Sequence, residues 1–345
     1  MLIRTLLTAT FVLRCQAACR PSPELEAELQ NAAELSAAVA DPFAALDKAA
    51  PFRAVRDHHP DDLFAHERYQ DAMNEYGIEG HLRLLNKEYR ALDFNHAGDP
   101  PGNLLYRYLY LRTLAGRNTP SAIQGLNELL AGNPDFAPAH RTLAEIYATE
   151  AFRDPARERL ERERYLAACP DGQFTRWPPA IPEPSHLIDD AGRSLAAGAT
   201  ADQVVAVTIQ GLRELEWRSQ RLRAFDWFTL DQKRQDAQDL RAHYWDAWAI
   251  QVRAYRNARQ TEKAAELLDA MNRRAALLAN TSSPEYWVSL ITLANLYSAT
   301  GEWDRVKEKM EDMRKYLALH PDPSRNREVE NLQKNMEQKV EVRLQ

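Results

Sequence analysis

Six consecutive residues form the only run in the sequence that resembles a metal site. They are Asp57-His58-His59-Pro60-Asp61-Asp62, and His66 follows shortly after. Asp62 and His66 would share one face of a helix at a spacing that can hold a hard or borderline metal ion. The alternative is a turn whose acidic residues begin the next helix and favour its dipole. The sequence shows no partners that would hold metal ligands in place, so it predicts no metal site and no cofactor.

Seven aromatic residues lie close together in a second region with potential chemistry. Large side chains of this kind usually fill irregular helix junctions in a core. The alternative is an exposed aromatic groove that holds a peptide or a sugar. The seven residues are Trp217, Phe225, Trp227, Phe228, Tyr244, Trp245 and Trp248.

Charged residues give little sign of catalysis. Arg and Glu alternate from Glu150 to Tyr165 at helical spacing, which is typical of a solvated helix face, and Asp189-Asp190 is typical of a helix N-terminus. The sequence contains no nucleophile elbow, P-loop, dinucleotide fingerprint or CxxC motif. A net charge of -6 argues against nucleic-acid binding. We therefore expect a protein that is not an enzyme and does not bind nucleic acid.

The first residues differ from the rest of the chain. Arg4 precedes an apolar run from Leu6 to Leu13, which has the length of a signal-peptide core. Small residues before Cys19 resemble a bacterial lipobox, which would make Cys19 a lipid anchor. We expect residues 1–23 to be a leader and linker, and the protein to be exported to the periplasm or the outer membrane. The alternative is a mis-assigned start and a cytoplasmic protein.

The cysteines predict no internal disulfide. Cys15 and Cys19 lie in the leader, which leaves Cys169 alone in the folded part. A single cysteine forms neither a disulfide nor a cysteine-based zinc site. The sequence therefore predicts that packing alone stabilises the fold.

Two stretches superimpose at a spacing of 34 residues, which is the length of one antiparallel helix pair. Capping residues precede prolines at Asp41-Pro42, Thr119-Pro120, Asp154-Pro155 and Ser283-Pro284, and each pair predicts a helix start. No run alternates with period two, so we expect no sheet. Tyr106, Leu109, Tyr110, Ala122 and Leu126 align with His140, Leu143, Ala144, Ala156 and Leu160.

These segments resemble tetratricopeptide (TPR) repeats, whose two helices combine bulky and small apolar positions. A third copy contains Trp248, Val252, Tyr255, Ala264 and Leu268. The fourth contains Leu290, Leu293, Ala294, Tyr297, Val306 and Met310, with Gly301 in the turn. The resemblance covers about half of the chain. It implies an all-α fold, a right-handed superhelical solenoid of antiparallel helix pairs in one or two arrays.

The resemblance also implies an organisation along the chain. We expect an N-terminal array over 24–171, a proline-rich connector over 172–186, and a C-terminal array over 187–345. The connector contains Trp177-Pro178-Pro179-Ala180-Ile181-Pro182-Glu183-Pro184, which excludes a helix. Val329, Leu332, Met336 and Val340 form one narrow apolar stripe, typical of a terminal capping helix.

In the TPR family the concave surface binds ligands, and the outward positions of the first helix of each pair line it. These positions carry arginines, which suits an acidic or carboxylate-bearing partner segment. They are Arg107, Arg141, Glu145, Arg253, Arg256, Asn257 and Asn295.

We therefore expect a non-catalytic scaffold of the bacterial cell envelope that binds a protein or peptide partner, with membrane association only through the lipid anchor. One alternative is a glycan- or peptide-binding lipoprotein that uses the Trp/Tyr cluster. Another is an accessory protein of a thioredoxin-like redox or transport system.

Overall fold

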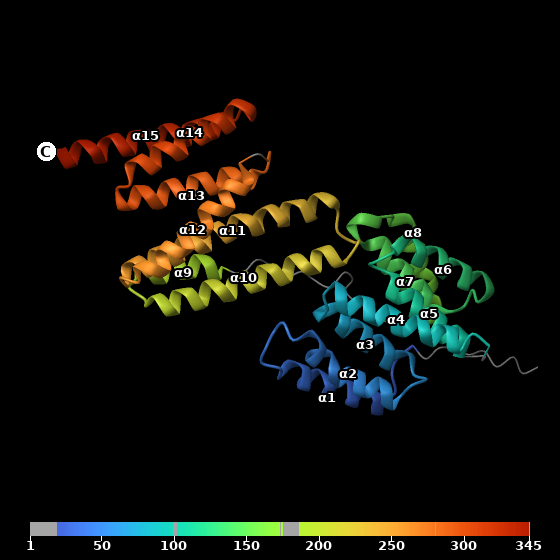
Figure 1. The fold of residues 1–345 in the computed structure, drawn as a ribbon. Coiled ribbons are helices and arrows are strands. Elements are labelled where there is room, and N and C mark those ends of the chain that lie inside the picture. Colours follow the sequence, from blue (N-terminus) through green and yellow to red (C-terminus); the bar gives the residue numbers. More distant parts are fainter. Residues whose placement is uncertain (1–18, 99–101, 173, 175–185, 280, 345) are drawn as a thin grey trace, which may run out of the picture. The chain divides into compact units, whose positions relative to one another are not determined.

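The computed structural model describes residues 19–98, 102–172, 174, 186–279 and 281–344 (Figure 1). Within these residues all regular structure is helical, which confirms the all-α prediction. No described helix is both long and apolar enough to span a membrane. The helices are α1 (Pro23–Ala37), α2 (Ala45–His58), α3 (Leu63–Tyr76), α4 (Glu79–Asn95), α5 (Gly102–Leu114), α6 (Thr119–Gly132), α7 (Ala137–Ala148), η1 (Glu150–Phe152), α8 (Pro155–Ala168), α9 (Leu187–Ala196), α10 (Ala201–Ala224), α11 (Leu230–Asn257), α12 (Thr261–Leu278), α13 (Pro284–Thr300), α14 (Trp303–Leu319) and α15 (Pro323–Leu344).

Two of the predicted N-caps are found, and a third helix begins one residue earlier than predicted, with Asn118 rather than Thr119 at its N-cap. Asp154 and Ser283 accept hydrogen bonds from the first backbone N–H groups of α8 and α13, and α6 begins at Thr119 with proline in its first turn. The fourth predicted start is wrong. Asp41 accepts a hydrogen bond from the Phe43 backbone 3.0 Å away, so the segment forms a turn and α2 begins only at Ala45.

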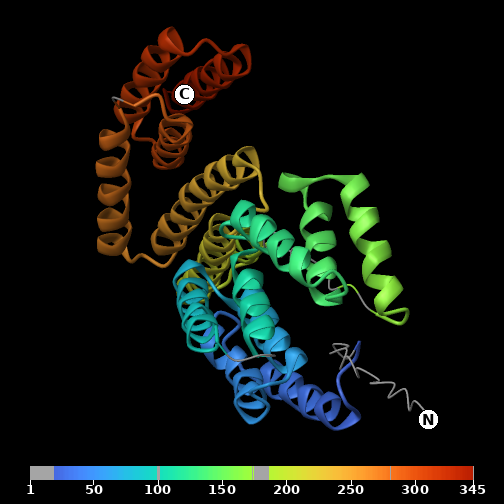
Figure 2. The same cartoon turned by 90° about the vertical axis from the view of Figure 1, so that its right-hand side faces the viewer.

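The described residues form two compact units. Unit 1 holds the described residues before 182 together with Gln220–Thr229, and unit 2 holds those of Pro182–Ser219 and Leu230–Gln345. In unit 1, consecutive helices from α1 to α8 pack on one another, and α3 also packs on α5. The close packing of α7 against α8 is visible in both cartoon views (Figures 1 and 2). The segment Gln220–Thr229, which the sequence assigns to a C-terminal array, belongs instead to unit 1.

In unit 2, α11 packs on α9, α12 and α13, and α13, α14 and α15 follow in sequence. One core surrounds α13, where Leu293 and Ala294 are fully buried, and a second joins α9, α10 and α11. Gly301 ends α13 in a left-handed conformation with φ of 75°, which glycine adopts without steric cost. Val329 and Leu332 of α15 are buried against the first of these cores.

The four repeat copies predicted from the sequence coincide with the helix pairs α5/α6, α7/α8, α11/α12 and α13/α14. Their small and bulky positions are mostly buried, because they fill the space between the paired helices. Fully buried examples are Leu109, Ala122, Leu126, Leu143, Val252, Leu293, Ala294 and Val306.

Helix α8 departs from the 34-residue alignment. Leu160 is 44% exposed and Ala156 is also exposed, whereas Glu161 and Tyr165 are buried. The connection between α7 and α8 contains η1 and is two residues longer than that between α5 and α6. Counted from each helix start, the buried pair of α8 matches Gly125 and Leu129 of α6. The longer connection thus shifts the buried face, and the sequence prediction that Ala156 allows close packing is wrong.

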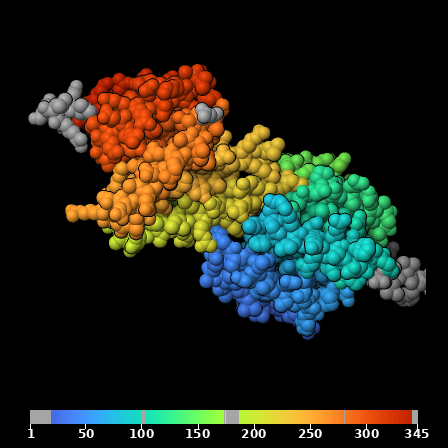
Figure 3. Space-filling model, in the orientation of Figure 1, coloured from blue at the N-terminus to red at the C-terminus, as the bar shows by residue number. Residues whose placement is uncertain are grey.

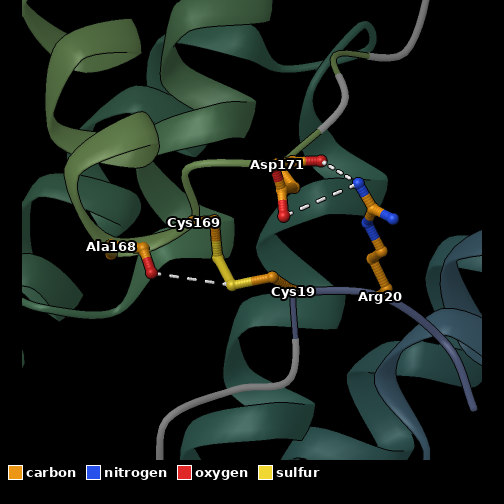
Figure 4. Close-up of a disulfide and its surroundings, with 5 residues drawn as sticks. All are labelled: Cys19, Arg20, Ala168, Cys169 and Asp171. Carbon is orange, nitrogen blue, oxygen red and sulfur yellow. Dashed lines mark hydrogen bonds and ion pairs between the residues drawn. A yellow bond between two sulfur atoms is a disulfide. The ribbon is translucent and has the colours of Figure 1, made fainter.

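A disulfide joins Cys19 to Cys169, with an S–S distance of 2.02 Å and a Cα–Cα distance of 5.4 Å (Figure 4). Next to it, Arg20 donates a hydrogen bond to the Asp171 carbonyl 3.3 Å away. The prediction that Cys169 has no partner is therefore wrong, because the fold brings residue 19 beside the end of α8. The bond also uses the sulfur that a lipid anchor at Cys19 requires, so one chain cannot carry both. Cys15, the signal-peptide core and the proline-rich run 177–184 lie outside the described residues.

The segment Gln220–Thr229 packs against the turn between α5 and α6. Asp226 accepts hydrogen bonds from the backbone and hydroxyl of Thr119, at 2.9 and 2.5 Å, and the Asp226 N–H donates to the Gly116 carbonyl at 2.7 Å. The Trp227 ring stacks on Phe225 and is 1% exposed. Burial lowers the pKa of Arg221 to about 10, and its guanidinium donates to backbone carbonyls of unit 1.

The disulfide gives a first prediction. Cys169→Ser should lower the free energy of unfolding of unit 1 by about 2–4 kcal/mol, because the unfolded chain loses a long covalent loop. Urea unfolding under oxidising conditions measures this change. A reductant should lower the stability of the natural chain to that of the variant and leave the variant unchanged. Equal stability of the two oxidised proteins would contradict the assignment.

Gly116 gives a second prediction. Its φ is +113°, and an added Cβ would lie 2.3 Å from the Trp227 ring. Gly116→Ala should therefore cost about 1–3 kcal/mol and shift the tryptophan fluorescence. Gly198→Ala is the matched control, since Gly198 has φ of +90° with nothing within 4 Å of its Cβ position. If both variants lose the same stability, backbone strain alone explains the effect and the contact with Trp227 does not contribute.

Candidate functional site

Two of the residues that the sequence assigns to a concave surface are buried. Arg141 and Glu145 of α7 are only 8% and 4% exposed, so the prediction that they have no packing role is wrong. Arg256 donates a hydrogen bond to the Leu296 carbonyl at 3.1 Å. Arg253, Asn257 and Asn295 are exposed on unit 2, and Arg107 is exposed on unit 1.

Arg141 is buried because it neutralises a carboxylate inside unit 1. Glu67 of α3 forms ion pairs with Arg141 of α7 and with Arg112 of α5, whose Nε lies 3.7 Å from the carboxylate. Arg112 also pairs with Asp71 at 2.5 Å. Tyr108 donates to Glu67 at 2.6 Å. These contacts join three helices through one buried charge cluster.

Electrostatics explains how Glu67 stays ionised. Burial raises the pKa of its carboxyl, but the nearby Arg141 and Arg112 outweigh burial and hold the pKa below its usual value. Burial and the Glu67 carboxylate both raise the pKa of Tyr108, so its hydroxyl remains a donor. A buried ion pair is tolerated only when further hydrogen bonds satisfy both partners. The sequence feature that could have revealed this buried charge cluster is a charged residue, Arg112, within the mostly apolar stretch from Leu109 to Leu114.

The other side of α5 lines an open groove of about 790 Å³. Helices α4 and α6 form its walls, and the surface over α4 and α5 is seen in Figure 3 (cyan). The lining residues are Arg90, Asp93, Phe94, Ala97, Asn103, Leu104, Arg107, Tyr110, Gly125, Glu128, Leu129, Gly132 and Asn133. Its volume lies within the range of natural ligand sites.

Two arginines and an exposed aromatic ring give this groove its chemistry. Arg107 Nη1 lies 3.0 Å from Asp93 Oδ2, which orients the guanidinium and leaves other N–H groups for a ligand. Arg90 and Phe94 both lie on α4. Arg90 is exposed, and the Phe94 side chain is 82% exposed. Gly132 has nothing within 4 Å of its Cβ position, so the missing side chain helps to keep the groove open. Sequence reasoning identified Arg107 but missed Phe94.

The sequence cluster around His58 does not form one site. His66 is buried, with Nδ1 2.9 Å from the Tyr89 hydroxyl and Nε2 2.7 Å from the Pro60 carbonyl, and burial lowers its pKa. Asp62 accepts hydrogen bonds from the first turn of α3 and caps that helix. The predicted pair of Asp62 and His66 therefore has a structural role, as the turn interpretation expects.

Three of the seven residues of the aromatic cluster are buried, and the other four are half-buried. Trp227 and Trp245 are 1% and 0% exposed, and Phe225 is 3% exposed. Phe225, Trp227 and Phe228 belong to unit 1, and the other four belong to unit 2. The seven residues therefore do not form one exposed aromatic groove, and the core interpretation describes them better.

No known protein family, curated protein or solved structure matches this chain.

The buried charge cluster gives a third prediction. Glu67→Gln should cost up to about 3–5 kcal/mol, because it removes the carboxylate that two buried guanidiniums share and leaves Arg112 with Asp71. Since the folded pKa of Glu67 is lowered, its contribution is present above the unfolded pKa of about 4.3 and is lost as the pH falls through the folded value. Urea titrations across pH should show the largest difference from the natural chain near neutrality.

Below the unfolded pKa this difference should narrow, because the natural carboxyl also becomes neutral. Glu163→Gln on the exposed face of α8 is the control and should change stability little. A difference that does not depend on pH would contradict an ionised Glu67.

Proposed function

We propose that this protein is a non-catalytic scaffold of the bacterial cell envelope that binds a polypeptide partner through stacked, TPR-like helix pairs. The observation that carries the proposal is the groove of α4, α5 and α6, where an exposed phenylalanine lies beside two arginines. Aromatic residues and arginine dominate the energetics of protein interfaces. The helix pairs and their close-packed motif positions support a solenoid architecture, in which such grooves recur.

The chemistry of the groove suggests the kind of partner. Phe94 and Tyr110 offer apolar surface, and Arg107 and Arg90 offer donors for a carboxylate. A segment with an apolar side chain next to an acidic residue would satisfy both. Asp93 and Glu128 in the same groove disfavour strongly acidic polymers, which agrees with the net charge of the chain.

The disulfide supports export. Disulfides persist in oxidising compartments such as the bacterial periplasm and are rare in the cytosol. A bond between Cys19 and Cys169 therefore fits the envelope location that the leader suggests.

Photo-crosslinking tests the proposal. Benzoylphenylalanine in place of Phe94, in the full chain expressed in its native host, should capture one partner polypeptide. Gly132→Leu, which places a large side chain in the groove, should abolish the adduct, and Arg107→Glu should weaken it. The same probe at Leu319, which is 78% exposed on unit 2, should not capture that partner.

The proposal fails if position 94 yields no adduct. It also fails if the adduct persists when the groove is filled, or if the probe at Leu319 captures the same partner.

A further inference from the structure

Three side chains near the start of unit 1 bring metal-binding atoms together. Glu28 lies on α1, His58 ends α2, and His59 follows it. Glu28 Oε2 lies 3.4 Å from His58 Nδ1 and 3.1 Å from His59 Nε2. All three ligand atoms lie within 4.8 Å of one another. The sequence run contains both histidines, but only the fold adds the glutamate.

The two distances from Glu28 to the histidines are close to those between neighbouring ligands of a tetrahedral zinc ion. Zinc binds nitrogen and oxygen at about 2.0–2.2 Å, so neighbouring ligand atoms lie about 3.3–3.5 Å apart. Two imidazoles and one carboxylate are a donor set that zinc uses in sites with three protein ligands and a fourth, open position. The His58 side chain is 74% exposed, so solvent reaches the cluster.

Two acidic residues that lie near these histidines in the sequence contact other groups. Asp57, which lies between Arg56 and His58 in the sequence, forms an ion pair with Arg56 at 2.5 Å. Asp61 lies 3.4 Å from the Tyr106 hydroxyl, on the other side of Pro60.

Packing fixes the backbone around Glu28, and hydrogen bonds fix the backbone around His59 and Pro60. Leu25 and Leu29 of α1, on either side of Glu28, are buried in the core of unit 1. The His59 N–H donates to the Val55 carbonyl at 3.0 Å. The Pro60 carbonyl accepts hydrogen bonds from His66 and from Tyr106. Ligands on such supported elements lose little freedom when a metal binds.

We propose that Glu28, His58 and His59 bind one zinc ion, with a fourth position left for water or an external ligand. The ion would join α1 to the end of α2 and would replace two hydrogen bonds to one carboxylate oxygen by three metal–ligand bonds. The site lies on other helices than the groove and does not depend on the proposed function.

Titration calorimetry tests this proposal on the untagged, oxidised full chain with Cys15→Ser, so that neither a tag nor a free thiol binds zinc. At a pH near 7.5, zinc chloride should bind at one equivalent per chain. Glu28→Gln and His59→Ala should each weaken binding at least about tenfold, as loss of a ligand requires. His186→Ala, an exposed histidine of unit 2, should leave the affinity unchanged.

Cobalt(II) provides a second measurement that reports geometry. The natural chain with cobalt should show the intense visible bands of tetrahedral coordination, and Glu28→Gln should lose them while its circular dichroism stays unchanged. Absence of stoichiometric zinc binding would overturn the proposal. So would an affinity that the Glu28 and His59 variants leave unchanged, or a weak octahedral cobalt spectrum.

Discussion

The structure of unit 1 depends on the neutralisation of one buried carboxylate. Moving the Glu67 charge out of water costs several kcal/mol unless opposite charges and hydrogen bonds replace the lost solvation. Arg112 and Arg141 supply those charges from two other helices. Because each residue turns a helix by about 100°, a slip of α5 by one residue would remove Arg112 from Glu67. The cluster therefore fixes the register of α3, α5 and α7.

The same register determines the groove on the other side of α5. Tyr108 and Arg112 are four residues apart and face the buried cluster. Arg107 and Tyr110 therefore face the groove between α4 and α6. A wall fixed in this way needs little ordering when a ligand binds, and preorganisation of this kind favours affinity. The buried charge cluster thus helps to fix the position of groove residues on the other side of α5.

Helix α1 shows how a terminal element is secured. It packs on α2 and α3, both of which follow it in the sequence. The disulfide fixes Cys19, four residues before α1, to the residue that follows α8, at a sequence separation of 150 residues. Glu28, in the first half of α1, lies beside His58 at the end of α2 and His59 after it. The disulfide restricts the chain before α1 more than an exposed contact would.

The sequence by itself determined the local structure. Apolar spacing and capped prolines predicted helices and no sheet, since both signals depend on residues within one or two turns. It placed Ala122, Ala264 and Leu293 in helix interfaces and one groove residue, Arg107, on the surface. The tertiary structure alone decided the pairing of Cys19 with Cys169, the burial of Arg141 against Glu67, the approach of Glu28 to His58, and the shifted face of α8. Each of these depends on residues far apart in the chain or on the length of a connection, and helical periodicity carries no information about either.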